Sequence, residues 1–148
     1  MSISIEPGHT FTFQELEVAT NNSGSENELG SGGFAVVYKG RLSNGTLVAV
    51  KKVLTAHNTP SHGLKEFEVE LKFLIKVRHG NLVSFLGYYI HLEHKLLVLE
   101  YVSNGTLTKH LFLSNGNDSL LTWNQRVRIT LHVAQGLEYI HNNILMTA

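Results

Sequence analysis

The residues with the most evident chemistry are glycines that precede a β-type run ending in lysines. The stretch LGSGGFAVVYKG, residues 29–40, holds four glycines, and VAVKK, residues 48–52, follows it. Closely spaced glycines at a hairpin tip allow backbone amides to approach phosphate groups. Side chains alternate along a strand, so Ala49 and Lys51 share one face, where the small alanine leaves room for a flat ligand beside an ammonium group. Together the two stretches predict a candidate binding site.

Alternative roles for the same residues stay open. In a dinucleotide-binding unit the glycines lie between a strand and a helix, whereas here the sequence predicts a second strand after them. The phosphate-binding pattern G-x-x-x-x-G-K-[ST] does not occur in the sequence. Glycines at a hairpin tip can also serve the turn alone, and a lysine at a strand end can simply lie in water.

A carboxylate on the next predicted helix adds a third element. Over LKEFEVELKFLIKVR, residues 64–78, apolar residues recur at helical spacing. The neighbours of Glu70 at three or four residues include Phe67 and Phe73 but no cation. A carboxylate in partly apolar surroundings needs a cation from another element, and Lys51 is the candidate, with a solvated glutamate as the alternative.

The first elements that position these residues are a helix and a set of antiparallel hairpins. Thr12 and Glu15 have the spacing of a capping box, which predicts a short helix that ends at Asn21 and Asn22. Residues 28–53 are rich in β-forming side chains and contain an Asn-Gly turn.

The later elements complete an order β-β-β-α-β-β and then become helical. Residues 54–63 predict a polar loop that ends at Gly63, and two β-type runs, residues 82–90 and 95–102, follow the helix. Thr122 and Gln125 predict the capped start of a long final helix. This helix has one apolar stripe, formed by Trp123, Val127, Leu131, Ala134 and Leu137.

Composition bounds the classes of partner. Twelve basic and twelve acidic residues cancel, so charge gives no argument for nucleic acid or an anionic membrane surface. Without cysteine, a signal-peptide pattern or an apolar run of about 18 residues, we expect a cytoplasmic chain that lacks disulfides and a membrane span. Among nine histidines, the pair His91 and His94 has no third ligand nearby, and we expect no metal site.

The order of glycine hairpin, V-A-V-K, helix with an unpaired glutamate and two strands resembles the amino-terminal lobe of protein kinases. More closely, FTFQELEVATNN, NELGSGGF, VVYKGRLSNGTLVAVKK, KVRHGNLVSFLGYY, LLVLEYVSNGTL and LTWNQRVRITLHVAQGLEYIH resemble the cytoplasmic kinase domain of plant receptor-like kinases, particularly the transmembrane leucine-rich-repeat type. The likeness covers roughly residues 11–141.

The resemblance implies an α+β fold, with a five-stranded antiparallel sheet and one helix followed by the first helices of a carboxy-terminal lobe. It divides the chain into a pre-kinase segment at 1–25, an amino-terminal lobe and hinge at 26–102, and the start of the second lobe at 103–148.

The resemblance also implies an ATP-binding site. Gly30 and Gly32 would belong to the phosphate flap, with Val37 against the adenine and Ala49 above it.

On the next strands, the resemblance implies that Lys51 would contact the α- and β-phosphates and that Glu70 would hold it in position. Leu99 would lie behind the nucleotide, and the backbone of Glu100 and Val102 would hydrogen-bond the adenine edge. Mg²⁺ is expected only with the complete domain.

Three features depart from the family. Ala35 stands where a third glycine is usual, which is tolerable at negative φ but predicts weaker nucleotide binding. Ser23 stands where a phenylalanine commonly anchors the pre-kinase segment, which puts the docking of residues 11–25 in question. The catalytic-loop aspartate, its asparagine and the Asp-Phe-Gly motif do not occur in these residues, so we assign no catalytic residue.

Three hypotheses of function follow. The chain is an incomplete stretch of a Ser/Thr receptor-like kinase, or a short regulatory module that binds nucleotide or another kinase domain without catalysis, or a chain that does not fold. We favour the first for what the sequence encodes by descent, with the parent family at the plasma membrane, and the second for the activity of this chain. The apolar stripe of the last helix predicts self-association.

Overall fold

The computed structural model describes residues 8–54, 60–91, 94–112 and 121–145. The chain forms two compact units. Unit 1 consists of Met1–Val77 and Ser84–Tyr101, and unit 2 consists of Arg78–Val83 and Val102–Ala148.

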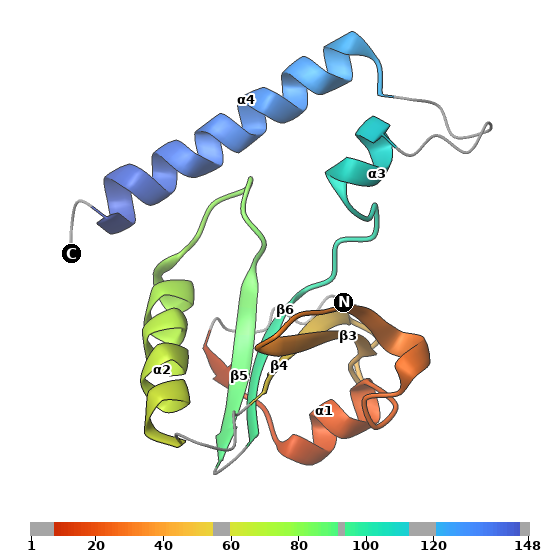
Figure 1. The fold of residues 1–148 in the computed structure, drawn as a ribbon, viewed down its shortest axis with the longest axis vertical. Coiled ribbons are helices and arrows are strands. Elements are labelled where there is room, and N and C mark those ends of the chain that lie inside the picture. Colours follow the sequence, from red (N-terminus) through yellow and green to blue (C-terminus); the bar gives the residue numbers. More distant parts are fainter. Residues whose placement is uncertain (1–7, 55–59, 92–93, 113–120, 146–148) are drawn as a thin grey trace. The chain divides into compact units, whose positions relative to one another are not determined.

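Unit 1 is built on a six-stranded sheet with the strand order β1-β5-β6-β4-β3-β2 (Figure 1). The strands are β1 His9–Thr10, β2 Glu28–Ser31, β3 Ala35–Arg41, β4 Leu47–Val53, β5 Phe85–His91 and β6 His94–Glu100. The predicted antiparallel strands are all present. The sheet has one more strand than predicted, because β1 pairs in parallel with β5.

Helix α1, Phe13–Ala19, begins with the predicted capping box. Glu15 N donates to Thr12 Oγ1 at 3.2 Å, and Thr12 N donates to Glu15 Oε2 at 2.7 Å. The helix ends just before the predicted asparagines. Asn21, Asn22 and Ser23 then adopt φ of 52°, 55° and 55°, the left-handed region that asparagine tolerates better than most residues.

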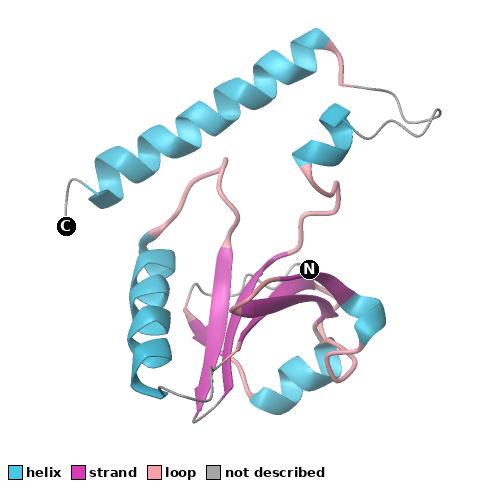
Figure 2. Cartoon of the chain, in the orientation of Figure 1, coloured by secondary structure: helices cyan, strands magenta, loops and turns pink. Residues whose placement is uncertain are grey.

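Helices α1 and α2, Pro60–Lys76, cover opposite faces of the sheet, as the helices and strands of Figure 2 show. The buried cluster between α1 and the sheet consists of Phe11, Leu16, Leu42, Val48, Val50, Leu96 and Val98. The buried cluster between α2 and the other face consists of Phe67, Phe85 and Leu97. The split follows the alternation of side chains along each strand, because Leu96 and Leu97 are neighbours in β6 yet belong to different clusters.

Two expectations about these helices need correction. The docking of residues 11–25 does not depend on an apolar residue at 23, because Phe11 is 5% exposed, Leu16 1% and Thr20 2%. The polar loop predicted for residues 54–63 extends too far, because α2 already begins at Pro60, and residues 55–59 lie outside the described residues. Proline suits the first turn of a helix, where its missing N–H has no intrahelical partner in any case.

Unit 2 contains α3, Leu107–Phe112, and α4, Trp123–Ile140, followed by a π-helical turn, His141–Leu145. The capping box predicted at Thr122 is present, since Gln125 N donates to Thr122 Oγ1 at 3.2 Å and Thr122 N donates to Gln125 Oε1 at 2.8 Å. Arg78 N donates to Tyr139 Oη at 3.0 Å, which joins α4 to residues 78–83. No helix in the described ranges has the length and apolarity to cross a membrane.

Candidate functional site

The register of the sheet brings five of the predicted site residues onto one face: Gly30, Val37, Ala49, Lys51 and Leu99. Gly30 lies opposite Val37, and Val37 lies opposite Lys51. In the next row Ala49 lies opposite Leu99. Residues directly opposite each other on neighbouring strands point to the same side of a sheet, so this face is also the one that α2 covers.

Lys51 and Glu70 form the predicted ion pair. Lys51 Nζ donates to Glu70 Oε1 at 2.7 Å, and the two side chains are 30% and 38% exposed. The pair links β4 to α2, and it holds the ammonium on the face of the sheet that α2 covers. Because both groups remain partly in water, the pair contributes little to stability, and its effect is to orient the lysine.

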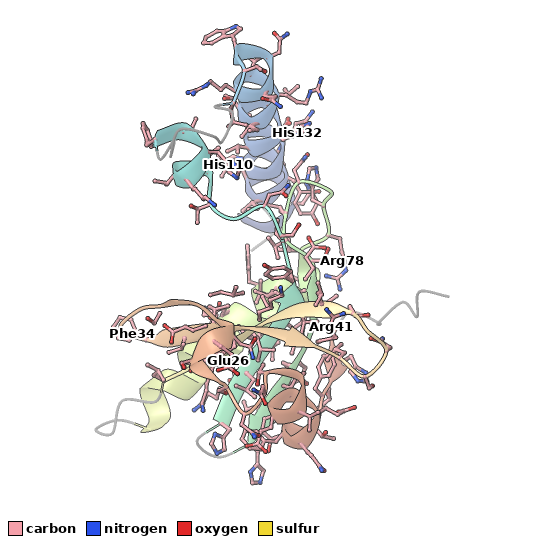
Figure 3. All side chains as sticks on the ribbon, turned by 90° about the vertical axis from the view of Figure 1, so that its right-hand side faces the viewer. Glu26, Phe34, Arg41, Arg78, His110 and His132 are labelled. Carbon is pink, nitrogen blue, oxygen red and sulfur yellow. The ribbon has the colours of Figure 1, made fainter. Side chains whose placement is uncertain are left out.

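The hairpin formed by β2 and β3 closes with a tight turn, in which Gly32 N donates to Ala35 O at 2.9 Å. Its tip is also joined to the residue after β4, because Leu54 N donates to Phe34 O at 2.8 Å. Phe34 is 81% exposed at the tip, as labelled in Figure 3. Ala35 begins β3 without a positive φ, so its conformation is one that alanine adopts without strain.

The fold itself gives no reason for glycine at three positions of this hairpin. A Cβ atom at Gly30, Gly32 or Gly33 would meet no protein atom within 4 Å, and none of the three has a positive φ. Gly40 differs, because a Cβ there would lie 3.1 Å from Val48 Cγ2 and 3.3 Å from Ala19 O. The backbone of the hairpin is thus open at residues 30, 32 and 33 to close approach by another group.

The end of β6 carries the remaining predicted residues. Leu99 packs against the cluster under α2. The backbone N–H of Glu100 already donates to Ser84 O at 3.0 Å. A ligand that contacts the backbone of Glu100 therefore has to use its carbonyl oxygen. Val102 is 54% exposed and belongs to unit 2.

One contact on the same face was missed from the sequence. Lys39 Nζ lies over the ring of Tyr101, 4.7 Å from its centroid. Lys39 is opposite Ala49 in the β3–β4 ladder, so it belongs to the row of Ala49 and Leu99. The alternation of side chains along β3 places Lys39 on the same face as Val37. The contact of Lys39 with Tyr101 could be predicted only from the pairing of β3, β4 and β6.

The comparison with family models decides the family. The model described as protein tyrosine and serine/threonine kinase matches residues 24–146. The chain belongs to this protein kinase family. Its members use ATP and Mg²⁺.

Curated relatives from Arabidopsis thaliana narrow the type to receptor-like Ser/Thr kinases. A probable receptor-like protein kinase is 45% identical over 93% of this chain and 28% of its own length. The receptor-like kinase TMK4 is 46% identical over 90% of this chain and 14% of its own length. The probable serine/threonine-protein kinase PBL21 is 43% identical over 89% of this chain and 34% of its own length. The chain thus spans about a third or less of these relatives.

Solved structures agree with the predicted fold. The pseudokinase DRIK1, drought responsive inactive kinase 1, in a co-crystal with ENMD-2076, matches with a TM-score of 0.82 and 30% identity. That match covers 94% of this chain and 53% of DRIK1. A second pseudokinase, in its apo form, has a TM-score of 0.80 and 30% identity over 95% of this chain and 51% of its own. The predicted kinase-like α+β fold and the family are therefore confirmed.

Proposed function

We propose that unit 1 binds ATP through the sheet face that carries Lys51. The observation that supports this most directly is the pair of glycines at 30 and 32, which the fold does not require. Gly30 lies in the same cross-strand row as Val37 and Lys51. Backbone amides of a glycine hairpin can approach phosphate oxygens where a side chain would keep them apart. An ammonium fixed by Glu70 supplies positive charge in the same row.

The remaining roles follow from the rows of the sheet. Val37 and Ala49 offer a small apolar surface for the adenine ring, and Leu99 limits the depth available behind it. The carbonyl oxygen of Glu100 is the group of unit 1 that we assign to the adenine edge. With the domain division at residues 25 and 102, these residues form the nucleotide-binding part of a receptor-like Ser/Thr kinase.

Phosphoryl transfer belongs, in this proposal, to the whole protein and not to these 148 residues by themselves. The complete domain transfers phosphate from MgATP to protein hydroxyls on the cytosolic side of the plasma membrane. The similarity to two pseudokinases favours a second candidate function, a module that binds nucleotide or another kinase domain and regulates it without catalysis.

Calorimetric titration with MgATP tests the binding proposal. We expect saturable binding to the wild-type chain and at least about tenfold weaker binding to Lys51→Met, because a charged hydrogen bond to phosphate is lost. Lys52→Met is the matched control, since Lys52 is adjacent in β4 but points to the opposite face.

Two results would contradict the proposal. One is the absence of binding to a wild-type chain that is shown to be folded. The other is equal loss of affinity in Lys51→Met and Lys52→Met, because the face of the sheet would then be irrelevant. Incubation of a partner kinase domain with the MgATP-loaded chain tests the second candidate, which requires a change in the partner's rate without phosphate transfer by this chain.

A further inference from the structure

We propose that Lys39 is a positioning residue for the adenosine part of the ligand, acting through the ring of Tyr101. The inference rests on the proposed nucleotide binding of unit 1. It starts from one contact, the ammonium of Lys39 held 4.7 Å from the centroid of the Tyr101 ring. A cation at this distance over an aromatic face is attracted by the quadrupole of the ring.

Tyr101 occupies a position where restraint matters. Strand β6 ends at Glu100, and Tyr101 is the last residue of unit 1. Among the described residues, no backbone hydrogen bond outside the helices and strands involves Tyr101. The contact with Lys39 is therefore a side-chain restraint on a residue that the ladder no longer holds.

The residue before Tyr101 in the chain is Glu100, whose carbonyl oxygen is assigned to the adenine edge. This carbonyl belongs to the peptide group that joins Glu100 to Tyr101. A hydrogen bond to a flat ring edge depends on the direction of the peptide group, so rotation about the backbone of Tyr101 changes the direction of this carbonyl. Holding the tyrosine ring against β3 narrows that rotation before the ligand arrives, which reduces the entropy lost on binding.

The position of Lys39 argues against direct contact with phosphate. Gly30, Val37 and Lys51 share one row of the sheet, whereas Lys39 shares the next row with Ala49 and Leu99. The two rows are two residues apart along β3, about 7 Å. Lys39 is thus displaced from the glycine hairpin towards the end of β6, where Tyr101 lies.

The charge of Lys39 has no other assigned use in the fold. Of the described residues, no carboxylate forms an ion pair with it, and the ion pair found on this face is that of Lys51 with Glu70. An ammonium that contacts an aromatic ring in this way is well suited to hold that ring in place.

Variants on both sides of the contact test the proposal with adenosine and MgADP as ligands. We expect Lys39→Met and Tyr101→Leu each to weaken the binding of both ligands by about two- to fivefold, the fold-change that corresponds to about 0.5–1 kcal/mol. The double variant should bind no more weakly than either single variant, because both remove the same contact.

Conservative variants separate this role from a general effect on the fold. Lys39→Arg keeps the cation and Tyr101→Phe keeps the ring, so both should bind adenosine with an affinity close to that of the wild type. Lys52→Met, on the opposite face of β4, should leave both affinities unchanged.

Each contrary outcome has a definite meaning. A loss for MgADP without a loss for adenosine means that Lys39 contacts phosphate, which overturns the proposal. Unchanged affinity of Lys39→Met, or additive losses in the double variant, overturns it as well. If the wild-type chain binds neither ligand, the proposed function itself fails and this inference falls with it.

Discussion

Gly87 is the residue on which the attachment of β1 depends, and replacing it with alanine is the most informative test of the fold. A Cβ at Gly87 would overlap His9 O and lie 2.7 Å from Phe11 Cε2. His9 O is backbone, which cannot rotate away as a flexible side chain can. The variant must therefore displace β1 from β5, where His9 pairs with Gly87.

The cost of Gly87→Ala can be worked out from what β1 holds in place. Phe11 N donates to Tyr88 O at 2.9 Å, and the Phe11 side chain is 5% exposed. Returning a phenylalanine to water costs about 1.5–3 kcal/mol, and losing the hydrogen bond costs about 0.5–1.5 kcal/mol. We expect Gly87→Ala to lower the free energy of unfolding by about 2–4 kcal/mol.

Urea unfolding followed by far-ultraviolet circular dichroism measures this loss. Gly30→Ala is the matched control and should change stability by less than about 0.5 kcal/mol, because nothing lies within 4 Å of its Cβ position. Phe11→Ala combined with Gly87→Ala should cost less than the sum of the single variants, because both disturb the same attachment. Stability of Gly87→Ala equal to that of Gly30→Ala would show that β1 stays attached without a glycine at 87. Full additivity with Phe11→Ala would show that the two residues do not share one attachment.

Three further predictions concern α1 and α4. Thr20→Val should lower the free energy of unfolding by about 1–3 kcal/mol in the same assay, because the buried hydroxyl that accepts from Ser23 N at 3.2 Å is lost; an unchanged midpoint would contradict this. The N–H of Thr12, and then its hydroxyl, hold the pKa of Glu15 below its ordinary value of 4.5. The charged form of Glu15 is thus favoured in the folded chain. Its contribution to the free energy of unfolding is present above pH 4.5 and is lost as pH falls through the lowered pKa. Unfolding midpoints between about pH 5 and pH 3 should fall more for the wild type than for Glu15→Gln, and parallel curves would exclude this assignment. Leu131 in α4 is 54% exposed within an apolar stripe, so light scattering should show less self-association for Leu131→Lys, whereas a wild-type monomer at all concentrations would contradict it.

Features set by neighbouring residues in the sequence were predictable. The capping boxes at Thr12 and Thr122 depend on a residue three positions away, and both are present. The separation of Lys51 from Lys52 follows from the alternation of a strand. The pairing of Lys51 with Glu70 could be inferred because the helix offers that glutamate no cation of its own.

Features that depend on contacts distant in the sequence were not predictable. Strand β1 has two residues, too few for a periodic pattern, and its place beside β5 depends on the absence of a side chain at Gly87. The docking of α1 was judged from a single residue, Ser23, although Phe11 and Leu16 carry the burial. The contact between Lys39 and Tyr101 requires a register that no local signal encodes.

Binding of nucleotide to the sheet face with Gly30, Gly32 and Lys51 can be followed residue by residue in amide proton–nitrogen NMR spectra during a titration with MgADP. We predict saturable shifts of the amide signals of these three residues, with those of Leu16 in α1 and Thr20 at its C-terminal end unchanged. Shifts confined to α1, or no shifts in a folded chain at millimolar MgADP, would contradict the account.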